Sequence, residues 1–592
     1  MSEMTDDVLG KAYDARLMRR LLTYLWPYRG AVLIALVAIV AQAALNLVPP
    51  YLVLQVIDVH IPSRDLSGLA KIGLVYLATL AGTFALEFTQ TWTLQLTGQR
   101  IMYDLRMQIY AHLQRLGLRF YDRHPVGRLM TRVTSDVDVL NDLFTSGVVS
   151  VFGDVFTLAG IMLVMLLLDW QAALVAFAVL PLIVIVTQWF RRNVRESYRQ
   201  VRYWIARINA FLQEHITGMA TVQLFRREAR TFDAFDTIDR THRDVNLQSI
   251  FYYAVFYPAI EVIGALATAL LIWYGGGRVV EETLTLGALV AFIQYSQRFF
   301  RPISDLSEKF NVLQAAMASA ERIFGLLDEA PEESTGPIEP AGPVEPAGPA
   351  GPRLAFEHVW FAYEGDDYVL RDVSFVVEPG QRVGIVGATG AGKTTIISLM
   401  LRFYDVSRGR ITLDGVDIRE IDRQVLRRHF GLVLQDVHLF SGTIESNIRL
   451  GTPAIDRDGV AAALAAVGAT RFVEALPGGV AAPVAERGAT LSVGQKQLLS
   501  FARALAHDPA ILVLDEATSS VDTETELAIR AALRSLMRGR TTIAIAHRLS
   551  TIQDMDTILV LHKGQLREQG SHQALLGERG IYYRLVQLQY GN

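Results

Sequence analysis

The sequence contains no cysteine, which excludes disulfide bonds, zinc–thiolate sites and thiol chemistry. Charged residues are few, at 20% of the 592 residues, and the net charge of −4 gives no argument for a nucleic-acid partner. The N-terminus has no cleavable signal pattern, so we expect the first hydrophobic stretch to stay in the membrane. Hydrophobic residues make up 51% of a chain too long for one ordinary domain.

Six hydrophobic runs lie in the first half of the chain. Each approaches or exceeds the ~20 residues that a helix needs to cross the hydrocarbon of a bilayer. Buried soluble helices could account for one or two such runs, but six make that reading improbable. The runs cover residues 31–57, 69–94, 140–168, 172–190, 252–274 and 284–300. The sequence therefore predicts an α-helical membrane domain of six transmembrane helices over residues 1–330.

The loops between these runs alternate between short and long. The long loops follow the second and fourth runs, have a helical pattern and are rich in arginine. Basic residues near span ends favour the cytoplasm. We therefore expect long cytoplasmic extensions of the helices, with both termini and the whole second half of the chain in the cytoplasm.

Three acidic residues, Glu87, Asp154 and Glu261, fall inside the predicted spans. Acids within a membrane are costly and seldom face lipid. They could line a cavity that accepts cations, or they could be paired with other groups. The sequence leaves both readings open.

A proline-rich linker is predicted over residues 331–352. From position 337 onward a proline occurs at every third position, namely Pro337, Pro340, Pro343, Pro346, Pro349 and Pro352. Such a segment favours polyproline II and a semi-rigid, exposed spacer. After it, short β-rich runs alternate with helical stretches, which predicts an α/β domain over residues 353–592.

A phosphate-binding loop opens this second domain. A buried strand pattern at 382–386 is followed by GATGAGKT and a helical stretch, which is the context that the motif requires. Its glycines let backbone N–H groups wrap phosphate oxygens, Lys393 should reach the β- and γ-phosphates of ATP, and the Thr394 hydroxyl should bind Mg²⁺. The expected ATP-binding residues here are Gly387, Thr389, Gly390, Ala391, Gly392, Lys393, Thr394 and Thr395.

A second motif, ILVLDE at 511–516, is typical of the strand that completes such a site. Asp515 would hold Mg²⁺ through water. Glu516 would orient and polarise the attacking water, as transfer of a phosphoryl group to water requires. The sequence thus predicts an ATP hydrolase.

The pentapeptide LSVGQ, from Leu491 to Gln495, narrows the family. Together with the phosphate loop it resembles the signature of ATP-binding cassette (ABC) proteins. Six spans followed by a cassette resemble one half of an ABC exporter, a helical membrane domain joined to an α/β P-loop ATPase. This resemblance implies a dimer that exports hydrophobic or amphipathic small molecules (drug, lipid or peptide) by alternating access, with ATP and Mg²⁺ as cofactors.

The family's other motifs can be carried over to matching positions. Tyr363 resembles the aromatic residue that stacks on adenine, and Gln435 the loop glutamine that touches Mg²⁺ and faces the membrane domain. The resemblance also implies that His547 contacts the γ-phosphate. Ser492, Gly494, Gln495 and Asp522 would serve ATP held by a partner. Stretches near 121–127 and 220–227 resemble the helices that couple the cassette to the membrane domain.

Val493 departs from the family pattern, because the LSGGQ signature has glycine there. A Cβ-branched residue restricts the backbone and hinders close approach of the partner's nucleotide. Chains with an intact glutamate and an altered signature resemble subunits of asymmetric exporters. We therefore favour a heterodimer with a second ABC half-transporter over a homodimer that tolerates valine.

The cargo stays open at this stage. A lipid or lipopeptide flippase and an exporter-shaped importer of a metal chelate are alternatives in the same fold. An ATP-gated channel or regulatory subunit is disfavoured by Glu516. The abundance of arginine, alanine and glycine indicates a bacterial genome rich in G and C, so the expected location is a bacterial cytoplasmic (inner) membrane, in contact with its lipids.

Overall fold

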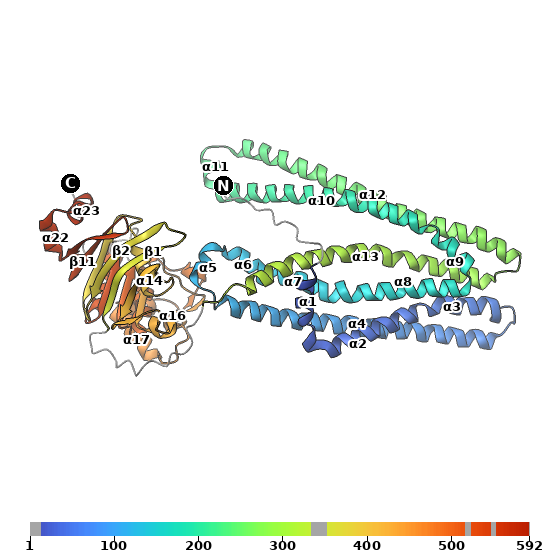
Figure 1. The fold of residues 1–592 in the computed structure, drawn as a ribbon, viewed down its shortest axis with the longest axis horizontal. Coiled ribbons are helices and arrows are strands. Elements are labelled where there is room, and N and C mark those ends of the chain that lie inside the picture. Colours follow the sequence, from blue (N-terminus) through green and yellow to red (C-terminus); the bar gives the residue numbers. More distant parts are fainter. Residues whose placement is uncertain (1–13, 333–351, 516–522, 546–551, 591–592) are drawn as a thin grey trace. The chain divides into compact units, whose positions relative to one another are not determined.

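A computed structural model describes residues 14–332, 352–515, 523–545 and 552–590. The chain divides into two compact units (Figure 1). The helical unit comprises Met1–Gln114 and Val126–Glu329, and the sheet unit comprises Arg115–Pro125 and Ala330–Asn592. The chain therefore passes from one unit to the other at three points.

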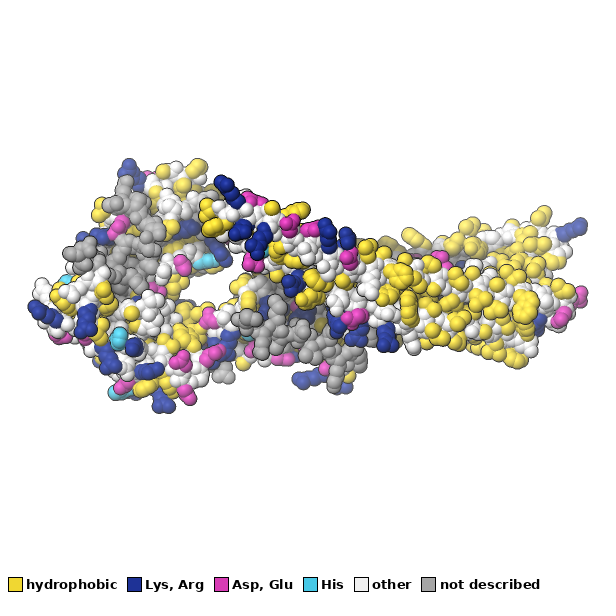
Figure 2. Space-filling model, turned by 90° about the horizontal axis from the view of Figure 1, so that it is seen from above, with side chains coloured by type: hydrophobic (Ala, Val, Ile, Leu, Met, Phe, Trp, Pro, Cys, Tyr) yellow, Lys and Arg dark blue, Asp and Glu magenta, His cyan; other side chains and the backbone are white. Residues whose placement is uncertain are grey.

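The helical unit is built from long helices joined by short turns (Figure 1). Its helices are α1 (Ala15–Thr23), α2 (Arg29–Asn46), α3 (Val48–Gln55), α4 (Leu66–Leu113), α6 (Val126–Val133), α7 (Ser135–Asp142), α8 (Val148–Leu168), α9 (Trp170–Phe177), α10 (Leu180–Thr217), α11 (Met219–Leu224), α12 (Glu228–Val280) and α13 (Leu286–Leu327). Hydrophobic side chains cover the half of this unit toward α3 and α9, and charged side chains gather over the other half (Figure 2).

Five helical stretches among the described residues are long and apolar enough to cross a membrane. They are Trp26–His60, Leu66–Leu113, Val151–Leu168, Trp170–Thr217 and Glu228–Val280. The sixth expected span, 284–300, coincides with the start of α13. There Gln294, Gln297 and Arg298 interrupt the apolar run.

A break in the first membrane stretch separates α2 from α3 at Leu47. Pro50 has no N–H to donate to the carbonyl of Asn46, four residues earlier. The Arg298 side chain of α13 donates to that carbonyl instead, and the Tyr295 hydroxyl donates to the carbonyl of Leu47 at 2.6 Å. The helix bend at the prolines is thus stabilised by two side chains of another helix.

The three intramembrane acids differ in their surroundings. Asp154 of α8 forms an ion pair with Lys309 of α13, and both side chains are largely buried. Glu87 on α4 and Glu261 on α12 are exposed in the single chain. The paired reading therefore holds for Asp154.

The sheet unit holds two larger sheets among its described strands. The first has the order β2-β1-β4-β5, formed by β1 (Leu354–Ala362), β2 (Tyr368–Val377), β4 (Arg408–Leu413) and β5 (Val416–Asp417). The second has the order β12-β11-β3-β10-β9-β6, formed by β3 (Arg382–Gly387), β6 (Phe430–Val433), β9 (Ile511–Asp515), β10 (Thr541–Ile545), β11 (Thr557–His562) and β12 (Gln565–Gly570). The inner strands of the second sheet pair in parallel.

Two apolar layers cover the two faces of the parallel sheet. In β9, Leu512 and Leu514 belong to one layer, while Ile511 and Val513 belong to the other. This alternation follows from the period of two along a strand, and burial on both faces explains why the strand reads as a continuous hydrophobic run.

Further helices of the sheet unit include α5 (Leu118–Arg123), α14 (Lys393–Met400), α15 (Arg423–Arg428), α16 (Ile444–Arg449), α17 (Arg457–Ala466), α19 (Val493–Ala506), α20 (Thr523–Met537), α22 (His572–Glu578) and α23 (Ile581–Tyr590). The expected coupling stretch 121–127 spans the end of α5 and the start of α6. The stretch 220–227 covers α11 and the turn that follows it, where Leu224 and Phe225 are exposed. The expected linker falls largely on residues 333–351, which lie outside the described residues.

Asp136 is a buried anchor between α7 and α13. Its carboxylate accepts hydrogen bonds from the Ser319 hydroxyl at 3.0 Å and from the Arg322 guanidinium at 2.5 and 3.0 Å. We expect Asp136→Ala to destabilise the protein by about 2 kcal/mol. This lies below the cost of breaking a fully buried pair because the Arg322 side chain is partly exposed.

The matched control is Asp138→Ala, which removes an exposed carboxylate bonded to Arg106. Its effect should stay below about 1 kcal/mol. Thermal melting in lipid nanodiscs compares the two variants, and equal losses of melting temperature would contradict the anchoring role of Asp136.

Candidate functional site

The phosphate loop lies between β3 and α14. Gly390 and Gly392 have φ angles of +79° and +98°, which side chains rarely adopt. A Cβ on Gly392 would also approach Leu370 Cδ2 to 2.5 Å. Ala388, Thr389 and Gly390 are exposed, so the backbone N–H groups before α14 can face a bound anion. The loop can therefore cradle phosphate oxygens.

Lys393 is buried at the start of α14. Its Nζ donates to the carbonyls of Gly387 at 2.9 Å and Ala388 at 3.0 Å. Burial lowers the pKa of Lys393, and the negative charge of Asp515 opposes that shift. A phosphate in the loop would compensate the ammonium charge, which is now balanced only in part.

The parallel pairing brings four strand ends to one edge of the sheet. Ile545 of β10 is in register with Ile385 of β3 and with Asp515 of β9, and β6 pairs alongside β9. The buried Asp515 ends β9, and the exposed Gln435 follows β6. Carboxyl ends of parallel strands are where α/β proteins bind ligands. This edge therefore carries the phosphate loop, the aspartate and the glutamine together.

Three expected site residues, Glu516, Asp522 and His547, lie outside the described residues. Glu516 directly follows Asp515 at the end of β9. His547 comes two residues after the last residue of β10.

Tyr363 follows β1 and is partly exposed. Its hydroxyl lies 3.1 Å from the hydroxyl of Thr395, which is buried. Thr394 is exposed at the start of α14. The two neighbouring threonines thus differ: Thr395 contacts the aromatic side chain, while Thr394 is open to solvent. Ala391 is buried beneath the loop.

The signature pentapeptide forms the start of α19. Ser492 caps the helix: its hydroxyl accepts from the N–H of Gln495 at 3.2 Å, and the Gln495 side chain accepts from the N–H of Ser492 at 2.9 Å. Gly494 is buried, whereas Val493 is helical and 59% exposed. Valine therefore causes no backbone strain in this chain, and only a molecule that approaches the helix end would meet its side chain.

Helix α5 contacts the neighbourhood of Tyr363 within the sheet unit. Arg119 donates to the carbonyl of Tyr363 at 3.4 Å, and Arg123 forms an ion pair with Glu364 at 2.9 Å. The Tyr404 hydroxyl donates to Asp122, and its ring packs edge-on against Tyr363. Sequence analysis did not identify these partners, because no spacing or motif links α5 to Glu364 and Tyr404.

Known protein families cover most of the chain. Residues 32–303 match the family described as ABC transporter transmembrane region, and residues 370–519 match the family described as ABC transporter. The two matched regions correspond to the helical unit and to the sheet unit respectively.

Relatives and solved structures agree with these matches. The ABC transporter ATP-binding protein YknV of Bacillus subtilis is 39% identical, over 99% of this chain and 96% of that protein. A fatty acid ABC transporter ATP-binding/permease protein of Mycobacterium bovis is 40% identical, over 84% of this chain and 78% of that protein. The ATP-bound structure of a bacterial Atm1-family ABC exporter is similar with a TM-score of 0.75 and 30% identity, covering 98% of this chain and 100% of that chain.

Because Lys393 is buried, Lys393→Met should affect the melting temperature differently without nucleotide and with ATP. Without nucleotide, the melting temperature should not fall, because the variant removes a charge that burial disfavours. With ATP, the rise in melting temperature seen for the unaltered protein should be lost, since the ammonium no longer balances the phosphates. Melting curves with and without ATP measure both effects.

Lys71→Met is the matched control, because Lys71 is an exposed lysine of the helical unit. It should keep the ATP-dependent rise. A Lys393→Met protein that is still stabilised by ATP as strongly as the control would contradict the assigned role.

Proposed function

Because the chain belongs to the ABC transporter family, as a half-transporter of the exporter type that couples ATP hydrolysis to transport, we propose that it exports hydrophobic or amphipathic small molecules. The observation that carries this proposal is one chain that holds both a set of membrane-crossing helices and an ATP site at the carboxyl edge of a parallel sheet. The protein is a multi-pass membrane protein, and its family members dimerise.

The ATP site suggests a division of roles. Backbone N–H groups of the phosphate loop and Lys393 bind the phosphates, and Tyr363 stacks on adenine. Thr394, Gln435 and Asp515 offer the hydroxyl, amide and carboxylate oxygens that suit Mg²⁺. When bound, the metal neutralises charge on the phosphates. Lys393, already buried and bonded to loop carbonyls, can turn to the phosphates without a new desolvation cost.

Glu516 is assigned as the residue that orients and polarises the attacking water. His547 is assigned to the γ-phosphate. Both positions follow strands whose ends lie beside the phosphate loop in the sheet order β3-β10-β9. Glu516 directly follows the end of β9, and His547 comes two residues after the end of β10. This closeness along the chain supports the two roles.

The partner is a second ABC half-transporter with a complete signature. The start of α19, where Ser492 is exposed and is followed by Gly494 and Gln495, would cover ATP held by the partner. Asp522 would approach the same interface. Val493 exposes its side chain at that helix end, which disfavours a close fit over nucleotide. In this arrangement Glu516 acts in the competent site, beneath the partner's signature.

Alternating access converts nucleotide binding into transport. ATP binds the closed pair of cassettes more tightly than the open pair, which is the differential affinity that a population shift requires. Closure is passed to the helices through α5 and α11, and hydrolysis at Glu516 resets the cycle. We assign the charged half of the helical unit (Figure 2) and the sheet unit to the cytoplasmic side of a bacterial inner membrane, since basic residues near span ends favour the cytoplasm.

The proposed cargo is amphipathic. A relative that is 40% identical is named a fatty acid transporter. Reconstitution tests this choice: ATP-driven movement of a fluorescent fatty acid across proteoliposomes is the expected result. Movement of a fluorescent phospholipid between leaflets would indicate the flippase instead, and uptake of a metal chelate would indicate the importer.

Glu516→Gln should lower the turnover of ATP by about 100-fold or more, because the amide cannot accept a proton from water. ATP binding should remain, since the phosphate loop is unaltered. The measurement is phosphate release by the chain together with a candidate partner subunit. Asp508→Asn, at an exposed carboxylate paired with Arg540, serves as the control and should keep the activity.

Val493→Gly tests the asymmetric dimer directly. If valine weakens the signature, the lone chain carrying Val493→Gly should hydrolyse ATP several-fold faster than the unaltered lone chain. Activity of the unaltered chain should instead depend on the second subunit. High Glu516-dependent turnover of the unaltered chain alone, unchanged by Val493→Gly, would contradict the heterodimer and favour a homodimer.

A further inference from the structure

Two of the three chain passages between the units are bonded to each other within the sheet unit. Arg115 is the first residue of one passage, and Glu332 follows the passage at Glu329. The N–H of Glu332 donates to the carbonyl of Arg115 at 2.9 Å. The Glu332 side chain also lies close to Gly117, where a Cβ would come within 3.3 Å of its carboxyl carbon. The segment that enters α5 and the segment that leaves α13 therefore meet at Glu332.

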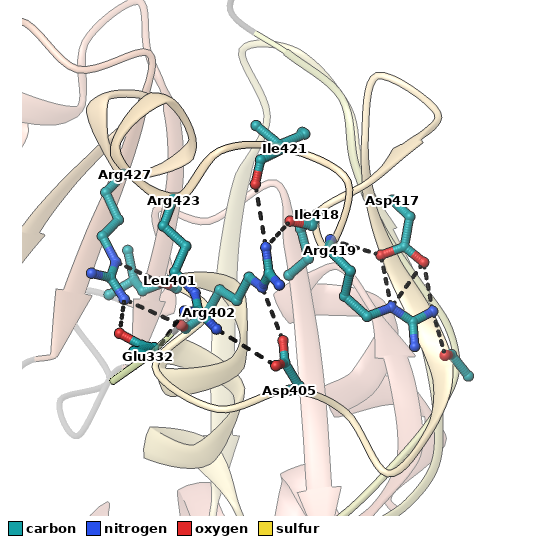
Figure 3. Close-up of polar contacts among 11 residues, drawn as sticks. Glu332, Leu401, Arg402, Asp405, Asp417, Ile418, Arg419, Ile421, Arg423 and Arg427 are labelled. Carbon is teal, nitrogen blue, oxygen red and sulfur yellow. Dashed lines mark hydrogen bonds and ion pairs between the residues drawn. The ribbon is translucent and has the colours of Figure 1, made fainter. Parts of the chain in front are cut away.

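The carboxylate of Glu332 faces helix α15. Its oxygens lie 3.5 Å from Nη1 of Arg423 and 3.9 Å from Nη2 of Arg427 (Figure 3). The side chains of Arg423 and Glu332 are only 14% and 22% exposed. Charges that are this far from solvent attract one another more strongly than an exposed pair does.

Arg427 of α15 packs on the segment that ends α14. Arg427 donates to the carbonyls of Leu401 at 3.1 Å and Arg402 at 3.2 Å, and its guanidinium lies over the ring of Phe403. Burial lowers the pKa of Arg427, and the charge of Glu332 opposes that shift. Loss of Glu332 would leave this guanidinium less well compensated.

The end of α14, helix α15 and the segment before α15 form one platform, whose parts are bonded together by the buried Arg402. Arg402 donates to the carbonyls of Ile418 at 3.2 Å and Ile421 at 3.3 Å, and to Asp405 at 2.9 Å (Figure 3). These bonds fix the segment before α15 to the end of α14, so the platform has little freedom to deform.

The platform is directly connected to the ATP site. Helix α14 begins at Lys393 of the phosphate loop, and α15 leads through His429 into β6. Gln435 follows the end of that strand. Glu332 is therefore bonded to a rigid piece whose two ends are the phosphate loop and the segment that carries Gln435.

We propose that Glu332 is a positioning residue. It makes the chain passages at Arg115 and after Glu329 move together with the ATP site. By binding α15 through its carboxylate and Arg115 through its N–H, it transmits nucleotide-driven motion to α4 and α13 together. The inference rests on the proposed export cycle. A simple anchor would stabilise the fold without affecting how far ATP binding moves the helices.

The absence of cysteine from this sequence allows site-specific spin labels without background. Ser63→Cys, in the turn before α4, and Glu281→Cys, after α12, are exposed positions for a label pair. The full chain with its partner subunit, in nanodiscs, gives the distance between the labels with and without ATP. Hydrolysis and melting temperature are measured on the same samples.

Glu332→Gln keeps the size of the side chain and the N–H bond to Arg115, but removes the charge. We expect the fraction of molecules that reach the ATP-state distance to fall by about threefold or more. Hydrolysis should stay close to that of the unaltered protein, whereas the melting temperature should fall, because Arg423 and Arg427 lose a charged partner. Glu357→Gln, which removes an exposed pair with Arg410 in the same unit, should change none of the three readouts.

Arg423→Gln and the double variant complete a mutant cycle. If Glu332 acts through Arg423, the double variant should lose no more of the distance change than the worse single variant. A Glu332→Gln protein with an unaltered distance change would overturn the inference, as would a loss that follows melting temperature alone. If ATP causes no distance change in the unaltered protein, the export cycle itself is wrong, and the inference fails with it.

Discussion

The parallel pairing of β3, β10, β9 and β6 is the constraint on which the ATP site depends. Each strand ends at the same edge of the sheet, so the phosphate loop, Asp515 and the segment of Gln435 lie along one edge. A slip of one residue would turn every side chain to the opposite face. The two apolar layers prevent this, because alternate residues of β9 are committed to one layer or the other.

The parts of the site that the sequence predicted are those whose chemistry lies in consecutive residues. The phosphate loop, the strand before Glu516 and the signature at 491–495 each need only a local pattern, and the family and the fold class were confirmed. The partners of α5 and of Glu332 could not be predicted in this way. Glu332 meets Arg423 only after both have folded, and single charges in a sequence carry no sign of their distant partners.

Two polar groups of the membrane-crossing helices are each satisfied by a basic side chain of α13. Asp154 is costly in lipid unless it is paired, and Lys309 supplies the charge from another helix. Pro50 leaves the carbonyl of Asn46 without its helical donor, and Arg298 supplies one. Arg298 is also one of the residues that make the sixth expected span less apolar.

We propose two kinds of coupling for this chain. One acts between subunits, and the other acts between segments of the same subunit. In the proposed dimer the signature at α19 would act on nucleotide held by another chain, so the exposed valine at position 493 would matter only when two cassettes close. The contacts of Glu332 join segments of the same chain and exist before any partner binds. Under these two proposals, asymmetry between two subunits would change which site hydrolyses ATP without changing how either subunit moves its own helices. A substitution in the signature should alter the rate of the cycle, whereas one at the bonded passages should alter how much motion each cycle yields.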